Sequence, residues 1–452
     1  MKRENIQPEN FAEKVIWFAI IWTYWFYALG ALYILGAAVA WILFFHLCRE
    51  LWKQDEQTPE EDKIRIPWSV WVWIGGMLMM EVALVVGHLD NNLGLGEIIK
   101  STIGWAKGWA LLALYPLVGC LKIRPELMYR ASALVCRTSL LISIPFVLAF
   151  YLHLPQKLYV SPLRAVGGPS DAFFEVMLYE IDPGEGKPRW RLYTPWAPAA
   201  GFVANIYFFM VIQEKDRKLR WLGIAGCVVI CQISASRLAL ICLPAVWLIS
   251  LYLSRLSRPK VLIASGFASF FVSISTNQII DAIHDFSEKF TAARKDSSRV
   301  RAALGRIAVY RWEKEAPIWG HGVVVKGPHM VEFMPIGSHH SWFGLLYVKG
   351  VVGYTSLAVP MGCGFIHMLY LSQRSTPAKV GLCMVMVLFF YTFGENLEIL
   401  AYLFWPGLVM MGIGAQTKYL EQENEDKDEG KLEASIEDDI STSNKTLPNL
   451  NE

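Results

Sequence analysis

The residues best suited to chemistry lie in the segment 317–353, where a glycine-rich loop passes directly into a membrane-length apolar run. The loop holds four histidines: His321, His329, His339 and His340. The last two are adjacent and stand where the polar loop meets the apolar run. Titratable groups at a membrane boundary are costly, and they are therefore candidates for function. Because the pKa of histidine suits proton transfer near neutral pH, one histidine of this pair is a candidate general base.

A metal site is a weaker explanation of the same histidines. Their spacings match no common zinc pattern, and no cysteine or clear carboxylate cluster accompanies them. We therefore expect no metal and no other cofactor. Under this interpretation His321 and His329 can be ordinary loop residues.

Arginines could supply an anion-binding site close to the histidine pair. Arg237 stands at the junction of two apolar segments, and the hydroxyl of Ser236 beside it could add a donor. A guanidinium offers a fixed fork of donors that matches phosphate oxygens and stays protonated. Further arginines fall on an amphipathic helix predicted before Pro317: Arg299, Arg301, Arg306 and Arg311. The alternatives are a helix-end arginine that reaches the membrane surface and a solvated helix face.

On this helix the spacing of seven residues places Arg299 and Arg306 on one face, whereas Arg301 points elsewhere. Three carboxylates are also costly at their positions: Glu81 inside an apolar run, and Glu395 and Glu398 in a short turn. A structural role is the default for each. Glu81 nevertheless keeps a transporter function open, because buried carboxylates serve in proton relays.

The composition sets the class of protein that must position these residues. The chain has 452 residues, 54% of them hydrophobic, with 18 tryptophans and a mean hydropathy of +0.34, which predicts an all-α polytopic membrane protein. We divide it into a transmembrane domain, 1–415, and an acidic tail, 416–452, predicted to be disordered and cytoplasmic. The eight cysteines fall in or beside apolar segments, which argues against a disulfide framework. The partner implied by this composition is the lipid bilayer; no nucleic acid is expected.

Ten apolar segments have spanning length, and the first apolar run, 15–47, is longer still. They are predicted at 67–87, 104–121, 132–152, 196–213, 221–236, 237–254, 261–279, 342–372, 379–394 and 397–415. The first run could be one long tilted helix or a two-helix hairpin that turns near Gly30. The hairpin gives about twelve spans and the single helix eleven.

Basic residues orient these spans, because cytoplasmic connections retain positive charge. The connections 215–220 and 255–260 are both strongly basic and should be cytoplasmic. Counting outward from them gives a cytoplasmic N-terminus, which favours the hairpin. It also places Arg237 and the long loops 154–196 and 280–340 on the outer face. Loops of this length are more typical of functional elements than of simple connections.

Together these motifs resemble those of the O-antigen ligase and polymerase superfamily, bacterial inner-membrane glycosyltransferases with a polytopic, GT-C-like fold. The matching features are Ser236-Arg237 at the start of an apolar helix, the arginine helix before Pro317-x-x-Gly320-x-Gly322, and His339-His340 before Gly350-x-x-Gly353. The useful part of the resemblance covers roughly 220–360. The family's large outer loop between its ninth and tenth helices agrees with the orientation derived from charge.

The family pattern runs from a histidine through Asn, Ser or Gln and nine further residues to Gly-x-x-Gly. Counting back from Gly350 assigns the family histidine to His339 and leaves His340 in the Asn, Ser or Gln position, which is a departure. The family's Arg-x-x-x-Leu motif corresponds to Arg237 with Ile241 in place of leucine. Its second arginine matches Arg301 best, and Arg299 or Arg306 could substitute for it.

The resemblance implies transfer of a glycan from an undecaprenyl-diphosphate carrier to an acceptor hydroxyl at the periplasmic face. The acceptor could be a glycan, a lipid or a protein, and neither a metal nor a nucleotide sugar is implied. His339 would take the acceptor proton, and Arg237 with Arg301 would stabilise the diphosphate that leaves. A groove between helices would hold the polyprenyl chain. The alternatives are a glycolipid or polysaccharide transporter or flippase, and a structural scaffold for an envelope polysaccharide complex.

Overall fold

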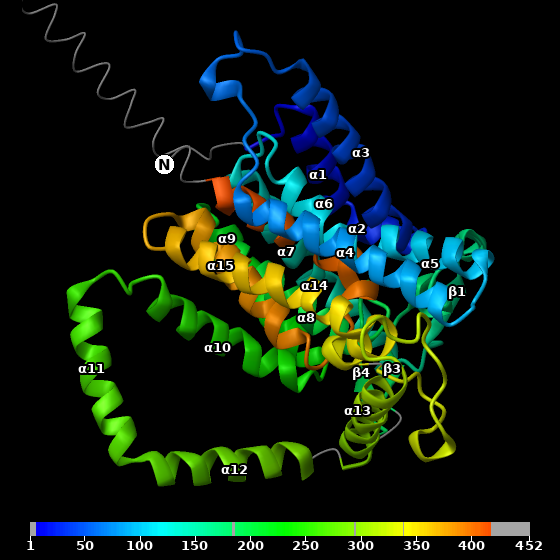
Figure 1. Ribbon diagram of the computed structural model, residues 1–452. Helices are drawn as coiled ribbons and strands as arrows, with labels where there is room; N and C mark the ends of the chain where they lie inside the picture. Colours follow the sequence, from blue (N-terminus) through cyan, green and yellow to red (C-terminus); the bar gives the residue numbers. More distant parts are fainter. Residues whose placement is uncertain (1–5, 183–185, 293–294, 338, 417–452) are drawn as a thin grey trace, which may run out of the picture.

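The computed structural model describes residues 6–182, 186–292, 295–337 and 339–416, so most of the predicted acidic tail lies outside the described residues. Its helices form a bundle, with small pieces of antiparallel sheet gathered at one end (Figure 1). Two helices, α8 (Ala197–Val211) and the last helix (Leu397–Gln416), bury nearly all of their residues and form the centre. This architecture is that of an all-α membrane protein.

The first apolar run is a helical hairpin, which is the second of the two alternatives predicted for it. Helix α1 (Phe11–Ile21) continues after a break into α2 (Thr23–Ala28), and the chain then turns back as α3 (Leu32–Lys53). The turn is at Gly30, whose φ is +66°. A Cβ atom there would lie 2.3 Å from Cβ of Ser161, so both the backbone conformation and the close approach require glycine.

Around the central helices the chain forms a ring of apolar helices. Their bounds are α4 (Trp68–Asp90), α5 (Leu95–Lys107), α6 (Leu111–Val118), α7 (Pro125–Tyr151), α9 (Arg217–Ile233), α10 (Arg237–Leu253) and α15 (Thr376–Tyr391), with the short η1 (Glu60–Asp62) before α4. The predicted span 104–121 is wrong as a single helix, because the chain breaks between α5 and α6. The break is at Gly108, where a Cβ atom would lie 3.0 Å from the backbone oxygen of Glu398.

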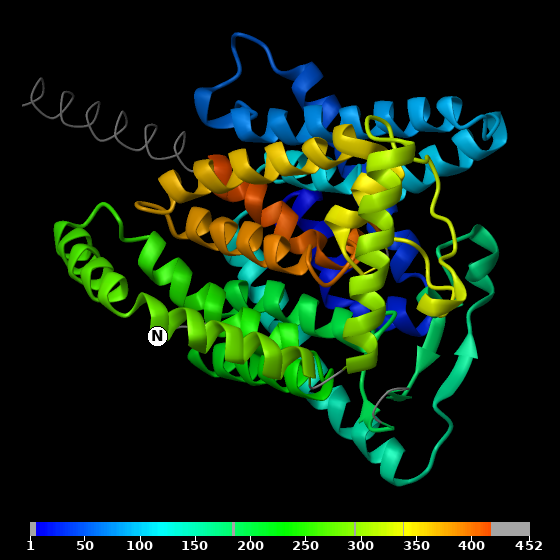
Figure 2. The same cartoon turned by 60° about the horizontal axis from the view of Figure 1, so that its bottom comes forward.

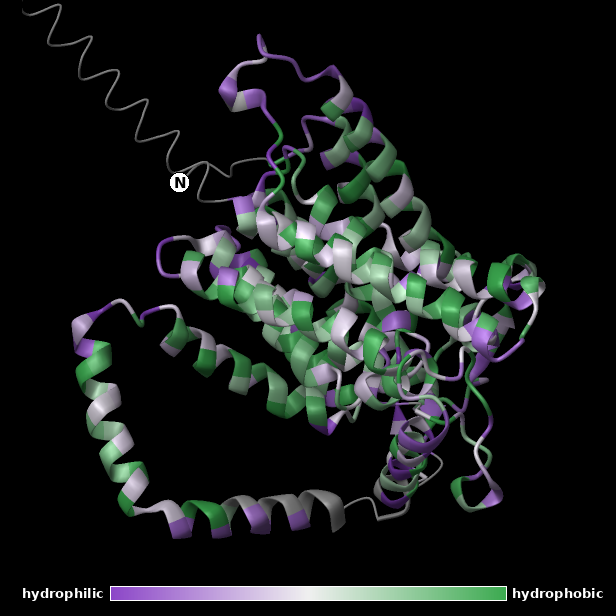
Figure 3. Ribbon diagram, in the orientation of Figure 1, coloured by the Kyte–Doolittle hydropathy of each residue, from purple (hydrophilic) through white to green (hydrophobic). Residues whose placement is uncertain are grey.

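Apolar residues run along the helices, whereas polar residues concentrate at their ends and in the connections (Figure 3). Among the described residues, five helices are long and apolar enough to cross a membrane: α3, α4, α7, α14 (Ser341–Leu371) and the last helix. A sixth span is possible from α11 (Pro259–Ile274) and the start of α12 (Thr276–Ala292), which are bent by 78° at their junction. Helices α8, α10 and α15 are shorter but also apolar.

Helices α11 and α12 form an open frame beside the bundle (Figure 1), and every residue of α11 is at least partly exposed. The frame leads to α13 (Lys295–Glu315), which is the predicted arginine helix. The predicted outer segment 280–340 is therefore mainly helical, with the short η4 (His329–Val331) after α13. α13 crosses the end of the bundle and packs on the first turns of α14 (Figure 2).

The segment 154–196 contains short strands that the sequence did not predict. Strand β1 (Lys157–Val160) pairs antiparallel with β2 (Glu175–Met177), and β3 (Glu180–Ile181) pairs antiparallel with β4 (Pro188–Arg189). Two single turns, η2 (Pro162–Val166) and η3 (Asp171–Phe173), complete it. Its end is tied to α8, because the Glu180 carboxylate accepts hydrogen bonds from the Ala197 backbone and from Arg189. The segment therefore covers the same end of the bundle as α13.

Candidate functional site

The site is built around a break in α14. The backbone at Gly350 has φ +62° and ψ −162°, which interrupts the helix nine residues after it begins. The turn 317–322 repairs the interruption: Val351 donates its backbone N–H to the carbonyl of Pro317 at 3.0 Å, and Gly322 donates to Val348 at 2.9 Å. A broken membrane helix needs such replacement partners, because the lipid core offers none.

The two glycine motifs of the sequence therefore pack against each other. We call this contact, between the turn 317–322 and the break at Gly350, the joint. A Cβ atom on Gly350 would lie 2.1 Å from the Ile318 carbonyl oxygen, and one on Gly320 would lie 2.4 Å from the Lys349 nitrogen. Gly320 and Gly322 have φ of +70° and +76°. At Gly353 a Cβ atom would lie 2.2 Å from Cβ of Lys349, so this glycine makes room for the lysine. These four glycines and the Pro317 carbonyl thus shape the joint.

The joint fixes the start of α14, where His339 and His340 lie in different environments. His340 is the N-cap: its Nδ1 accepts the backbone N–H of Phe343 at 3.3 Å, and its ring stacks on the Phe343 ring at 3.9 Å. An N-cap acceptor is more often Asn or Ser, and in this chain the His340 ring takes that role. Burial lowers the pKa of His340 to about 4.

His339 is free of this capping role and lies close to a cation. Its backbone is left-handed, with φ +62°, which is unusual for a residue with a side chain. Burial, with a smaller contribution from the Arg301 guanidinium, lowers the pKa of His339 to about 4. The imidazole is therefore neutral at neutral pH and able to accept a proton.

Arg301 reaches this position because of the amphipathic pattern of α13. The buried face of α13 carries Val300, Ala303, Leu304 and Ala308. At 100° per residue Arg301 lies at one edge of this face, while Arg299 and Arg306 lie together at the opposite edge. Of the three, Arg301 is the one that interacts electrostatically with His339 and with Glu395. Helix geometry thus separates the candidates that the motif alone left open.

Glu395, for which the sequence favoured a structural role, is a further candidate residue of the site. It lies in the turn 392–396 between α15 and the last helix, and its side chain is 4% exposed. The indole of Trp196 donates to its Oε2 at 3.1 Å. Burial raises the pKa of Glu395 to about 7, although Arg301 and the Trp196 bond act in the opposite direction. Its position in the sequence already indicated a functional candidate, because a carboxylate next to an apolar span is costly.

The turn 392–396 contacts both the start of α14 and the start of α10. On one side the Ser341 hydroxyl donates to the Glu395 carbonyl at 2.8 Å, which holds the start of α14. On the other side Leu238 packs against Gly394, where a Cβ atom would lie 2.9 Å from Leu238 Cδ2. Arg237 is the first residue of α10, so its guanidinium and the positive end of the helix dipole lie at the same end of the bundle as His339.

Ser236 has a structural role at the start of α10. Its Oγ accepts the Ala239 backbone N–H at 3.3 Å as the N-cap of α10, and the residue is 6% exposed. The predicted Arg-x-x-x-Leu position Ile241 is an exposed residue of α10, 41% exposed. Arg237 itself is partly buried. The contribution of this helix to the site is therefore the arginine.

Arg311 and His321 have structural partners in one cluster. Arg311 pairs with Glu315 at 2.8 Å and donates to the Tyr347 hydroxyl at 2.8 Å. His321 contacts Glu315 at 2.8 Å and stacks on Tyr347 at 4.3 Å. These contacts join the end of α13 to α14. His329, in contrast, is exposed and lies in η4, away from this cluster.

An apolar groove starts at His340 and runs between α14 and α15. Its volume is about 890 Å³. Its lining is almost wholly apolar: Trp312, His340, Trp342, Phe343, Leu346, Val351, Tyr354, Ala358, Met361, Gly362, Phe365, Val385, Met386, Phe389 and Phe393. The indole of Trp342 donates to Thr392, which attaches the groove wall to the same turn that carries Glu395. A chain-like apolar ligand could lie in this groove with a polar end near the histidines.

A buried lysine that the sequence analysis did not single out, Lys349, directly precedes the break at Gly350. Lys349 is 4% exposed and interacts electrostatically with the carboxylates of Glu398 and Glu81. Glu81 also accepts a hydrogen bond from Thr102 at 2.6 Å. The costly carboxylates Glu81 and Glu398 thus have a structural function, as counter-charges of a buried lysine. A lysine inside an apolar run was a signal available from the sequence.

No protein-family model matches this sequence, and the comparison with curated proteins also gives no match. The choice of function therefore depends on the motifs and on the geometry of the site. That geometry combines a neutral histidine, two arginines and a buried carboxylate at one end of the bundle, next to an apolar groove. Such a site can accept a proton, stabilise a polyanion and hold a long apolar chain.

Proposed function

We propose that the protein is a bacterial inner-membrane glycosyltransferase of the O-antigen ligase and polymerase type. It would move a glycan from an undecaprenyl-diphosphate carrier to an acceptor hydroxyl. The observation that carries this proposal is the neutral His339 beside Arg301, adjacent in the chain to His340 at the head of an apolar groove. A lipid diphosphate has the same layout, with a polyanion next to a long apolar chain.

In the proposed reaction the acceptor hydroxyl attacks the anomeric carbon of the carrier-bound sugar. His339 takes the hydroxyl proton as the new glycosidic bond forms. The bond between the anomeric carbon and the diphosphate oxygen breaks, and its electron pair stays on the diphosphate. Arg237 and Arg301 stabilise the charge that develops there. Direct displacement of this kind inverts the anomeric configuration.

The electrostatics of the site support this order of events. Arg301 disfavours the charged form of His339 when no anion is present. A bound diphosphate would offset the arginine charge and raise the pKa of His339, which makes it a better base when the donor is in place. Glu395, with its pKa raised to about 7, would position the Arg301 guanidinium and respond to the same anion.

The proposal includes an orientation in the membrane. About twelve spans, with both termini in the cytoplasm, place α13, the segment 154–196 and the start of α14 at the periplasmic face. Basic connections at the opposite end of the bundle support this orientation. The groove between α14 and α15 then lies in the membrane, where a polyprenyl chain could enter from the lipid.

The glycan profile of a strain that lacks the gene tests this function. Lipid-linked glycan should accumulate and the corresponding surface glycan should disappear, and wild-type protein but not His339→Ala should reverse both changes. Accumulation of full-length polymer would indicate a ligase, and accumulation of single repeat units a polymerase. Full complementation by His339→Ala would contradict the proposal.

The transporter or flippase alternative draws on the buried cluster of Lys349, Glu398 and Glu81. In the structure these charges face one another, and Lys349 is nearly inaccessible. A transporter would leave transfer to another protein. Purified protein that moves labelled lipid-linked glycan between leaflets without forming a new glycosidic bond would favour this alternative.

A further inference from the structure

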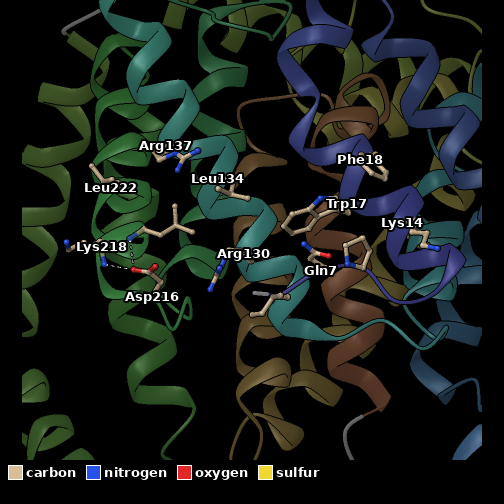
Figure 4. Close-up of a pocket in the computed structure, with 13 residues that line it drawn as sticks. Gln7, Lys14, Trp17, Phe18, Arg130, Leu134, Arg137, Asp216, Lys218 and Leu222 are labelled. Carbon is tan, nitrogen blue, oxygen red and sulfur yellow. Dashed lines mark hydrogen bonds between the residues drawn. The ribbon is translucent and has the colours of Figure 1, made fainter. Parts of the chain in front are cut away.

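A second cavity lies at the end of the bundle opposite to the candidate site, between α1, α7 and α9. Its volume is about 990 Å³. Figure 4 shows basic side chains on both sides of it, with Lys14 on α1, Arg130 and Arg137 on α7, and Lys218 on α9. We propose that this cavity binds an anionic phospholipid, with the phosphate among the basic residues and an acyl chain against the apolar wall.

The charge of the lining favours an anion. Among the lining residues, four are basic and one, Asp216, is acidic. The Asp216 carboxylate caps α9, where it accepts the backbone N–H groups of Lys218 and Leu219. Arg130 is held by Glu214 through two hydrogen bonds of 2.8 Å. The positive potential of the cavity therefore comes mainly from Lys14, Arg137 and Lys218.

Arg137 is the most informative of these residues. It lies two turns beyond Arg130, about 10 Å along α7 at 1.5 Å per residue, and hence well inside an apolar span. Its Nε atom is buried and has no hydrogen-bond partner among the described residues. A guanidinium at this depth is costly unless an anion or water reaches it. Arg137 lines the cavity, so a phosphate group that enters from the membrane surface could neutralise this guanidinium.

The apolar part of the lining favours a lipid over a free anion as the ligand of this cavity. Trp17 and Phe18 of α1 face Leu134 of α7 and Leu222 of α9 across the cavity (Figure 4). Basic pockets between membrane helices at the cytoplasmic side are typical sites for anionic head groups. The cavity lies at the basic end of the bundle, so this position fits a lipid of the inner leaflet. The site does not depend on the glycan-transfer function.

Native mass spectrometry of the delipidated full chain can test the site. We would titrate it with phosphatidylglycerol and with phosphatidylcholine of the same acyl chains. Phosphatidylglycerol should bind preferentially, and Arg137→Gln should weaken that binding about fivefold, the scale of one basic residue beside an anionic head group. The double variant Lys14→Gln/Lys218→Gln should weaken it further. Both lysines are exposed, so this variant tests the site even if Arg137→Gln does not fold.

Lys260→Gln is the matched control, because Lys260 is an exposed cation of another basic connection. It should leave binding unchanged. Equal binding of the two lipids, or an equal loss in Lys260→Gln, would overturn the proposal. Competition with inorganic phosphate distinguishes the source of the anion: displacement of phosphatidylglycerol by millimolar phosphate would indicate a site for soluble anions and would also overturn it.

Discussion

The joint between the turn 317–322 and α14 predicts an unequal effect of two identical substitutions in one helix. Gly350 and Gly362 both lie in α14. Gly350→Ala adds a methyl group at φ +62° and ψ −162°, a backbone region that is essentially restricted to glycine. Gly362→Ala adds the same group where no atom lies within 4 Å.

The magnitudes follow from these surroundings. For Gly350→Ala, backbone strain costs roughly 1 to 3 kcal/mol. Its Cβ atom would stand 2.1 Å from the Ile318 carbonyl oxygen, and relief of such overpacking costs roughly 1 to 3 kcal/mol more. The total of about 2 to 6 kcal/mol is a large part of the usual stability of a protein. Gly362→Ala should instead stabilise the helix by up to about 1 kcal/mol.

Thermal unfolding in detergent, followed by tryptophan fluorescence, measures both variants under the same conditions. Gly350→Ala should lower the Tm markedly, and Gly362→Ala should leave it unchanged or raise it. Glycan transfer should be lost in Gly350→Ala even below its Tm, because the joint fixes the start of α14 and therefore His339. Equal Tm values for the two variants would refute this account of the joint.

Three other predictions concern charged residues. The Tm of Glu395→Gln minus that of wild type should increase from pH 4.5 to about 7, because native Glu395 keeps its proton over this range whereas the unfolded chain loses it at the ordinary pKa of 4.5. The difference in unfolding free energy changes by at most about 3 kcal/mol, and a Tm difference that does not vary with pH would contradict the raised pKa. Lys349→Met should lower the unfolding free energy by about 3 to 5 kcal/mol, because it leaves buried carboxylates without a counter-charge. Adding Glu398→Gln should restore part of the lost Tm, and no restoration would show that the two groups do not interact. Arg301→Gln should reduce the rate of glycan transfer at least tenfold while Arg306→Gln changes it little; similar rates in both would remove Arg301 from the site.

Local sequence rules predicted the parts of this fold that depend on neighbouring residues. The hairpin alternative for 15–47 placed its turn near Gly30, where the structure has a left-handed glycine. The spacing of residues on α13 is enough to place Arg301 on a different face from Arg299 and Arg306. The all-α membrane class followed from composition, and five described helices have the length and hydropathy to support it.

Features that depend on contacts between distant segments could not be predicted in this way. The sequence marked Gly320 and Gly350 as turn residues, but only packing shows that each leaves room for the backbone of the other. Hydropathy alone could not reveal the break at Gly108, because the window 104–121 is apolar enough to be a span despite Lys107. The N-cap role of His340 likewise depends on where α14 begins, which is set by the joint and the turn 392–396.

The most direct test of the central claim compares His339→Asn with His340→Asn in purified protein, with lipid-linked glycan and acceptor supplied. Asparagine keeps an N-cap acceptor at position 340 but cannot act as a base at position 339. We expect His340→Asn to keep its transfer rate within tenfold of wild type and His339→Asn to lose roughly 10² to 10⁴ in rate at an unchanged Tm. Near-normal transfer by folded His339→Asn would contradict the claim that His339 is the general base.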